Sequence, residues 1–354
     1  MGSNKWQEWN SNDKGSLMKI AIIGGGWVGC HLAAKLFRDH NVSIYEKNQH
    51  LFQETSFKNQ NRLHLGYHYP RSFKTRELCL NTFDRFLTEY SFFVRDVTNN
   101  WYCIENNKSI LDYGTFLKIF NGQDHYEVEN IFKNVEGVIN TNEKQIDFEA
   151  AYVFFNYELG ELHIRDEVTK EKLKDLSKRY DLVIDCTNNH LEHKTKTKSF
   201  FEVTVSYLYK KIKPTPFDAL TMVDGPFFSI YPYKDDLYTV TDVEHTPLKR
   251  FKKSTQIEKY KEDIQKTNFL REHSYLIEKK IKKYYPEFLD HFEYNGYYLS
   301  TKSKIVSGSD HRYPIIIPNK NIIHCFTGKI QGIYIIEDYI TRYISNYYDT
   351  RSIK

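Results

Sequence analysis

The chain has 354 residues, which is enough for one large domain or two interleaved domains with a substantial core. Its 50 basic and 46 acidic residues nearly balance, so the charge gives no reason to expect a nucleic-acid partner. The five scattered cysteines form no CxxC pair and no metal-ligand spacing, which favours a reducing compartment and predicts no metal site. No apolar run is long enough to span a bilayer, and we therefore expect a cytoplasmic protein.

A glycine-rich turn follows the first predicted strand, residues 19–23, and opens a helix with apolar residues on one face. Gly24 permits the tight turn, and Gly26 lets the backbone approach a pyrophosphate closely. Gly29 lets the helix pack against the strand, while the helix N-terminus offers unpaired N–H groups to an anion. The pattern predicts a dinucleotide site, and its alternative is a glycine turn in an ordinary α/β unit.

A second predicted strand, residues 41–46, ends in an acidic side chain about twenty positions after the first glycine. Glu46 can accept hydrogen bonds from a ribose 2′-hydroxyl, and its charge would repel a 2′-phosphate. We expect both of its carboxylate oxygens to hold the ribose of the dinucleotide.

The middle of the chain carries two helix signals and two strand signals. Apolar residues at helical spacing predict one helix around 78–90 and another over 148–159, the second ended by Gly160. A short strand is predicted at 162–165, and a buried strand at 181–187.

The pattern changes near residue 200. Apolar residues then alternate from Phe201 to Tyr209, which predicts a half-buried antiparallel strand. Residues 249–285 are rich in Lys and Glu and predict helix with a solvated face. The remaining predicted elements are three further strands of the antiparallel sheet, one strand near the C-terminus and a last helix, at 218–222, 227–231, 237–243, 321–325 and from residue 333.

The polar loop after Glu46 ends in Asn59-Gln-Asn-Arg-Leu-His64-Leu-Gly66-Tyr-His-Tyr69. Together with the glycine turn and the order of the elements, it resembles the D-amino-acid oxidase superfamily of FAD-dependent oxidoreductases. The loop is similar to that of L-2-hydroxyglutarate oxidases and their relatives, roughly N-S-G-V-I-H-A-G-V-Y-Y, which lies along the flavin. The resemblance implies FAD as the cofactor, and flavin contacts from Ser56, Arg62, Leu63 and His64.

Two segments in the middle of the chain resemble the same family. Val168 lies where the family contacts the adenine through its backbone. Thr187 follows a buried strand, where the family has an Ala-x-Gly motif, and here Asn188 replaces the glycine. Asn tolerates a left-handed backbone better than most residues do.

Two segments near the C-terminus complete the resemblance. Thr301-Lys302 and Asp310-x-x-x-Pro314 are similar to the family's G-x-R-P…D-x-x-P-x-I-G. Lys302 replaces the usual Arg, and a lysine does not bind a carboxylate through two parallel hydrogen bonds as an arginine does. The segment Gly328-Lys-Ile-Gln-Gly332 resembles the closing glycine motif, whose backbone N–H groups face the flavin N1–C2=O edge.

The resemblance implies an α/β fold, α+β overall, in which a Rossmann-like FAD-binding domain with a mixed central sheet is interleaved with a substrate domain on an antiparallel sheet. We assign residues 18–70, 145–195 and 305–345 to the FAD-binding domain, and 71–144 and 196–304 to the substrate or cap domain. Residues 1–17 are polar and are expected to form a disordered leader. The expected cofactor contacts are Gly24, Gly26, Trp27, Val28, Gly29, Glu46, Lys47, Ser56, Arg62, Leu63, His64, Val168, Thr187, Gly328, Lys329, Ile330, Gln331 and Gly332.

The family chemistry is oxidation of a CH–NH or CH–OH group of a small molecule by hydride transfer to flavin N5. An alcohol substrate would need a general base, for which His64 and His68 are candidates. The basic residues of the expected site, Arg62, Arg71, Arg312 and Lys329, predict an anionic substrate. The candidate catalytic residues are His64, Tyr67, His68, Arg312 and Lys329.

Two other classes of function stay open at this point. One is a flavoprotein with monooxygenase or non-redox isomerase chemistry, because such proteins share the first glycine motif. The other is a nucleotide-binding protein that keeps the fold without catalysis. The sequence leaves the substrate, the electron acceptor and the oligomeric state open.

Overall fold

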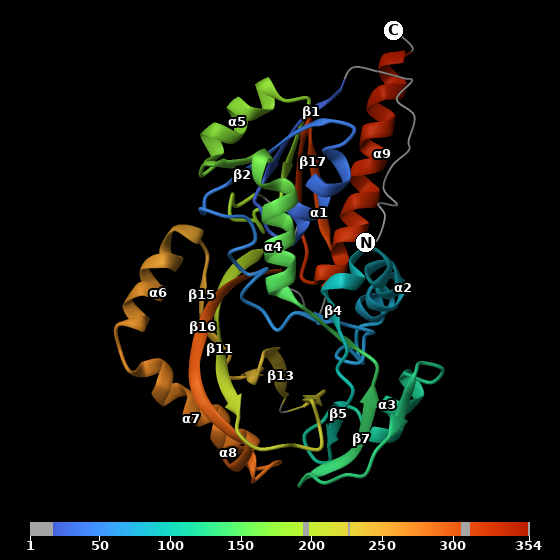
Figure 1. The fold of residues 1–354 in the computed structure, drawn as a ribbon, viewed down its shortest axis with the longest axis vertical. Coiled ribbons are helices and arrows are strands. Elements are labelled where there is room, and N and C mark those ends of the chain that lie inside the picture. Colours follow the sequence, from blue (N-terminus) through green and yellow to red (C-terminus); the bar gives the residue numbers. More distant parts are fainter. Residues whose placement is uncertain (1–16, 194–197, 226, 306–311, 353–354) are drawn as a thin grey trace, which may run out of the picture.

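The structure is a computed structural model that describes residues 17–193, 198–225, 227–305 and 312–352 (Figure 1). All of the predicted leader except Leu17 lies outside these residues, as does Asp310 of the predicted C-terminal motif. The fold is mixed α/β, with two large sheets and one small one among the described residues. None of the helices in these ranges is long and apolar enough to cross a bilayer.

The first large sheet has six strands and carries the glycine turn. Its neighbours are parallel except at one edge, where the last two strands of the chain pair antiparallel. The strand order is β17 (Ile315–Asn319), β18 (Ile322–Phe326), β10 (Leu182–Asp185), β1 (Lys19–Ile23), β2 (Asn41–Glu46) and β9 (His163–Arg165).

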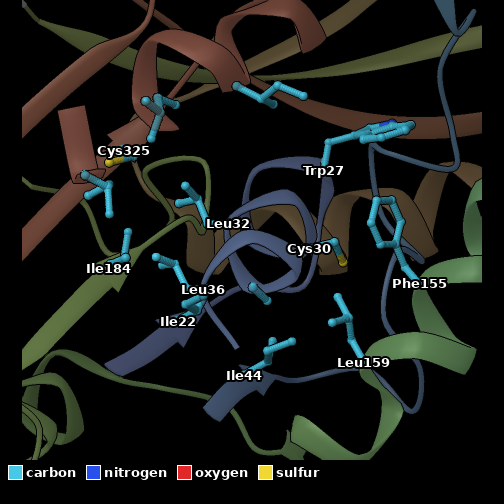
Figure 2. Close-up of a cluster of buried hydrophobic side chains, with 14 of the residues drawn as sticks. Ile22, Trp27, Cys30, Leu32, Leu36, Ile44, Phe155, Leu159, Ile184 and Cys325 are labelled. Carbon is cyan, nitrogen blue, oxygen red and sulfur yellow. The ribbon is translucent and has the colours of Figure 1, made fainter. Parts of the chain in front are cut away.

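Helices cover both faces of the six-stranded sheet. One face packs against α1 (Trp27–Leu36), α2 (Phe73–Tyr90), α4 (Phe148–Leu159) and α9 (Ile333–Ser352), and the other against α5 (Lys170–Arg179). Figure 2 shows the first of these cores, with Leu32 and Leu36 of α1 lying over strand residues such as Ile22. Burial of these apolar side chains is the main stabilising contribution to this half of the molecule.

The second large sheet is mostly antiparallel and is covered on its outer side by α6 (Ile257–Gln265), α7 (Phe269–Ile281) and α8 (Phe288–His291) (Figure 1). Helix α3 (Tyr113–Ile119) packs near β5 and β7. The strands are β5 (Asn100–Glu105), β6 (His125–Glu127), β7 (Val135–Thr141), β11 (Ser199–Lys211), β12 (Ala219–Val223), β13 (Phe228–Lys234), β14 (Leu237–Asp242), β15 (Pro247–Phe251) and β16 (Phe292–Ile305). A third, small sheet joins β3 (Arg62–Leu63), β8 (Lys144–Ile146) and β4 (Val94–Arg95).

The six-stranded sheet draws its strands from 19–46, 163–185 and 315–326, and the antiparallel sheet draws its strands from 100–141 and 199–305. The assignment of domain boundaries stays a prediction. Strand β16 was not predicted, although it pairs with β11 along its whole length.

Helix α4 ends at Leu159 with Gly160 as its C-cap, as predicted, and Gly160 has a φ of −59° and starts a 3₁₀ turn. Two other local expectations need correction. Residues 249–285 begin as strand β15 and then form two helices, α6 and α7, separated by a turn. Strand β11 is buried on both faces and not half-buried, because its apolar side packs under α6 and α7 and its polar side faces a cavity.

Candidate cofactor and active site

A cavity of about 1000 Å³ is lined by residues of both large sheets. The glycine turn, the loop over residues 54–72 and the segment 325–330 contribute to its wall, and so do the polar residues of β11 and β16. Its volume is at the upper end of that found for ligand and cofactor sites.

Close backbone packing explains two of the glycines in the turn. Gly24 has a φ of +96°, and a Cβ there would lie 2.9 Å from the carbonyl oxygen of Cys186. A Cβ on Gly29 would overlap the carbonyl oxygen of Gly24, so the helix can approach the strand only with glycine at this position. The turn delivers the N-terminus of α1 to the cavity with no acidic residue in its first turn. This end of the helix is therefore suited to an anion.

The residues that follow Gly26 have separate roles. The backbone N–H of Trp27 donates to Ser56 Oγ at 2.9 Å, which ties the glycine turn to the polar loop. The indole of Trp27 points into the core beside Phe155, as Figure 2 shows, so its contribution to the cavity comes from other atoms of the residue. Gly26 and Val28 both line the cavity.

Glu46 is buried at the end of β2 and lines the cavity. Its Oε1 accepts two hydrogen bonds from Asn48, from the backbone N at 2.9 Å and from Nδ2 at 2.7 Å. Its Oε2 accepts one hydrogen bond, from Gly25 N at 2.8 Å. A carboxylate oxygen can accept two hydrogen bonds, so Oε2 keeps an acceptor position and Oε1 does not. One oxygen of Glu46, Oε2, is therefore available to a ribose hydroxyl in this structure, and the ribose contact itself stays a prediction.

The neighbouring cavity wall includes several of the other expected contacts, namely Lys47, Ser56, Val168 and Thr187. The Oγ1 of Thr187 is buried without a hydrogen-bond partner among the described residues, as expected of a group whose partner is a ligand. Asn188 has a φ of +56°, in the left-handed region that the family's glycine would occupy without strain.

A chain of hydrogen bonds connects the cavity wall to a buried carboxylate. Lys329 Nζ lies 2.9 Å from His64 Nε2, and His64 Nδ1 lies 3.2 Å from Glu143 Oε2. Burial and the nearby Lys329 charge lower the pKa of His64 to about 4, so the imidazole is neutral at physiological pH. Burial also lowers the pKa of Lys329 to about 7, where both of its protonation states are populated.

Sequence reasoning missed Glu143. It lies between β7 and β8, is fully buried and contacts a loop almost eighty residues earlier in the chain. No local pattern marks it, because its partners come together only when the small sheet forms. The one feature that points to Glu143 is its position next to the expected flavin loop, and this position is known only from the folded structure.

The closing glycine motif forms a 3₁₀ turn that opens α9. Gly328, Lys329 and Ile330 line the cavity, whereas Gln331 and Gly332 do not. The Gln331 amide donates to the carbonyl oxygens of His64 and Cys79, each at 2.8 Å, and so fixes the motif to the flavin loop and to α2.

The remaining expected residues divide into two groups. Arg62, His64, His68, Arg71 and Arg312 all line the cavity with Lys329. Leu63 and Tyr67 are fully buried away from it, and the Tyr67 hydroxyl donates to the carbonyl oxygen of Asp124 at 3.0 Å.

Comparison with known proteins identifies the family of the chain. The family model described as FAD dependent oxidoreductase, DAO, matches residues 19–94. The chain is 30% identical over 340 residues to FAD-dependent monooxygenase FPY4 of Fusarium mangiferae, covering 92% of this chain and 91% of that protein. The chain belongs to the DAO family of FAD-dependent oxidoreductases. It is also 23% identical to FAD-dependent monooxygenase kojA of Aspergillus flavus, covering 89% of this chain and 83% of that protein.

Solved structures of oxidases have the fold of this DAO-family protein. Glycine oxidase from Bacillus cereus matches with a TM-score of 0.64 at 14% identity, over 93% of this chain and 95% of that one. L-α-Glycerophosphate oxidase from Mycoplasma pneumoniae, solved with FAD bound, matches with a TM-score of 0.63 at 13% identity, over 93% and 94% of the two chains.

FAD is the cofactor of this DAO-family protein, and the residues of the cavity fit it. The glycine turn brings the N-terminus of α1 to the cavity for a pyrophosphate, and Glu46 Oε2 keeps an acceptor position for a hydroxyl. The Thr187 hydroxyl, which has no hydrogen-bond partner among the described residues, and the amine of Lys329 are further polar groups on the same wall.

We expect Glu46→Ala to weaken FAD binding by about 1–3 kcal/mol, because a ribose hydroxyl would lose its acceptor. FAD content after extensive dialysis measures the loss. Glu167→Ala is the matched control, since Glu167 is an acid on the wall of the same cavity. Equal FAD content in Glu46→Ala and Glu167→Ala would refute the ribose contact.

Proposed function

We propose that this protein oxidises a CH–NH or CH–OH group of a small anionic substrate by hydride transfer to FAD. Bound FAD supplies the two-electron acceptor, and the protein supplies the orientation, the charge and the acid–base groups. The main evidence for an anionic substrate is Lys302. This residue is a cation on the cavity wall and has no counterion of its own among the described residues.

Lys302 lies opposite Glu202 in the β11–β16 register. Glu202 is nevertheless engaged elsewhere, by Arg250 Nε at 3.0 Å and by Lys304. Within the described part of the chain the ammonium of Lys302 has no hydrogen bond and no ion pair, and burial together with Lys304 and Arg312 lowers its pKa to about 8. An anion bound there would gain a charge-assisted hydrogen bond and remove much of the repulsion among these cations.

Two of the other predicted anion-binding residues, Arg71 and Arg62, contact protein partners. Arg71 pairs with the buried Asp224. Arg62 donates to Thr221 Oγ1 at 2.7 Å, and its guanidinium lies 3.9 Å from the ring centroid of Tyr231. Arg71 is therefore engaged, whereas Nε and Nη2 of Arg62 are buried without a hydrogen-bond partner among the described residues, so Arg62 is a second candidate for the substrate anion beside Lys302.

Acid–base chemistry at the cavity wall centres on Lys329 in this proposal. Both ring nitrogens of His64 are engaged, so His64 can take a substrate proton only if its bond to Lys329 breaks. His68 is a neutral imidazole, because burial and then His64 hold its pKa well below the usual range. Lys329 can hold or release a proton near neutral pH, which is the property that a general acid or base needs.

A second candidate is monooxygenation, which the names of the two relatives favour. That reaction places one atom of O₂ in the product and the other in water, and it consumes two electrons from a reductant such as a reduced nicotinamide. The two candidates therefore differ in their requirement for a reductant and in the destination of the oxygen.

Anaerobic mixing of the yellow holoenzyme with a substrate panel tests the proposal. The panel pairs carboxylated or phosphorylated amines and alcohols with their neutral counterparts, and loss of flavin absorbance is the measurement. Reduction by anionic members supports the proposal. Reduction only by neutral members refutes the anionic substrate. Reduction only by a reduced nicotinamide, with label from ¹⁸O₂ appearing in the product, favours monooxygenation instead.

We expect Lys302→Met to raise KM for the anionic substrate at least about tenfold with a smaller effect on kcat, because one charge-assisted hydrogen bond is lost. Lys304→Met is the comparison, since Lys304 is already paired with Glu202. A larger KM effect in Lys304→Met than in Lys302→Met would contradict this assignment.

A further inference from the structure

The buried carboxylate of Glu143 has every acceptor position filled. Its Oε1 accepts from the backbone N of Leu65 at 2.8 Å and of Gly66 at 3.1 Å. Its Oε2 accepts from the Tyr102 hydroxyl at 2.5 Å and faces His64 Nδ1 at 3.2 Å. Four donors around one carboxylate favour its ionised form strongly.

This arrangement determines which nitrogen of His64 carries the proton. An ionised carboxylate can only accept, so His64 Nδ1 must donate to it. In a neutral imidazole the other nitrogen is then an acceptor, and His64 Nε2 faces Lys329 Nζ at 2.9 Å. An ammonium can only donate, so Lys329 Nζ donates to His64 Nε2. The ionised state of Glu143 thus determines the direction of both hydrogen bonds.

We propose that Glu143 is a positioning residue, which fixes the tautomer of His64 so that His64 Nε2 holds the Lys329 ammonium at the cavity wall toward the cofactor ring. The inference does not depend on the proposed substrate. The placement of Lys329 toward the cofactor ring rests on the assignment of the closing glycine motif to the flavin. The tautomer of His64 does not depend on that assignment. Lys329 also lies 4.5 Å from the ring centroid of Tyr69, which limits where the ammonium can move.

The charged and titratable groups around this chain of bonds come from several elements. The negative charge of Glu143 and the thiol of Cys79 act to raise the pKa of Lys329, against burial and the charges of Arg312 and Lys302. Arg62, Lys329 and Glu143 act on His64. His68 faces His64 at a ring-centroid distance of 5.2 Å, and Tyr102 faces Glu143.

Glu143→Gln reverses this order of donors and acceptors without changing its shape. Two backbone N–H groups require the amide oxygen at the Oε1 position, so the amide nitrogen takes the place of Oε2. It then donates to His64 Nδ1, and the proton moves to His64 Nε2. That nitrogen can no longer accept from Lys329, so the bond that holds the ammonium is lost.

The ¹⁵N shifts of the imidazole ring of His64 report the tautomer directly in FAD-loaded, histidine-labelled protein, with the signals assigned by their loss in His64→Gln. We expect the Nδ1–H tautomer in the wild type and the Nε2–H tautomer in Glu143→Gln. The matched control is Glu105→Gln, a buried glutamate of β5 that accepts from Asn107 and Lys108, and it should leave His64 unchanged. An Nε2–H tautomer in the wild type overturns the proposal, and so does an Nδ1–H tautomer in Glu143→Gln.

The pH dependence of the flavin absorbance spectrum tests the step from His64 to Lys329. We expect a midpoint near the Lys329 pKa of about 7 in the wild type and in Glu105→Gln. In Glu143→Gln the midpoint should fall by at least about one pH unit, because an opposite charge and an acceptor are both removed from the ammonium. An unchanged midpoint in Glu143→Gln overturns the positioning role even if the tautomer reverses.

Discussion

Gly29→Ala should abolish FAD binding and lower the free energy of unfolding by about 3 kcal/mol or more. The added Cβ would overlap the carbonyl oxygen of Gly24, and Ile22 Cγ2 would lie 3.3 Å away. The first obstacle is backbone and cannot rotate away, so α1 must move off β1. That movement displaces the helix N-terminus from the cavity and opens the core between α1 and the six-stranded sheet.

Gly160→Ala is the control for this prediction. Gly160 has a φ of −59°, and among the described residues, its two chain neighbours and the backbone of its own helix aside, no atom lies within 4 Å of the position that a Cβ would take. Alanine therefore fits there and should stabilise the protein by about 0.4–1 kcal/mol. Chemical denaturation measures the free energies of unfolding, and flavin absorbance measures the cofactor content. Wild-type stability and full flavin content in Gly29→Ala would show that α1 does not pack on β1 in this way.

Lys329→Met should lower the rate of flavin reduction by substrate about 10²–10³-fold, the size of effect seen when a group that stabilises developing charge is removed. Methionine has a similar length and no charge, so it can occupy the same space beside Tyr69. Stability at neutral pH should be kept or increased, because burial disfavours the ammonium. Stopped-flow reduction under anaerobic conditions provides the rate.

The stability of Lys329→Met should also depend on pH in a defined direction. The pKa of Lys329 is lowered to about 7 in the folded protein, and it is about 10.4 in the unfolded chain. Between these values the unfolded chain binds more protons, so the wild type gains stability as the pH rises and the variant does not. Lys35→Met, on α1 and paired with Glu89, is the control. A rate in Lys329→Met equal to that of Lys35→Met would remove Lys329 from the reaction.

The parts of the fold that sequence reasoning predicted are those whose cause is local. The glycine turn is one example, because the contact between Gly24 and Gly29 lies within a few residues and its requirement for glycine is steric. Strands β1, β2 and β10 are mostly apolar and largely buried, so their composition alone marks them.

Strand β16 was not predicted because its polar residues face the cavity. Lys302 and Ser300 lie opposite Glu202 and Thr204 of β11, so the pair of strands is polar on the side that faces the cavity. In a single sequence such residues look like an exposed face. Tyr67 shows the opposite difficulty, since a tyrosine beside two catalytic candidates turned out to pack between Tyr102 and Phe120.

The polar contacts of the site depend on long-range pairing. Arg62 reaches Thr221, and His64 reaches both Glu143 and Lys329, over separations of 159, 79 and 265 residues. The resemblance to a known family placed His64 and Lys329 near the cofactor, but it gave no reason to connect them. The connection depends on which loop meets which strand, and that is a property of the assembled fold.

The two faces of β11 have different consequences for how this protein can change. Val203 and Val205 and their apolar neighbours contact the helices, so substitutions there act on folding. Glu202, Thr204 and Ser206 alternate with them and contact the cavity. The two sets of side chains lie on opposite faces of the same strand and do not contact the same surroundings. A library of variants at Glu202, Thr204 and Ser206 should therefore change which ligands the cavity accepts while the core stays intact. Along β11, residues at which mutation changes ligand preference thus alternate with residues at which mutation changes stability.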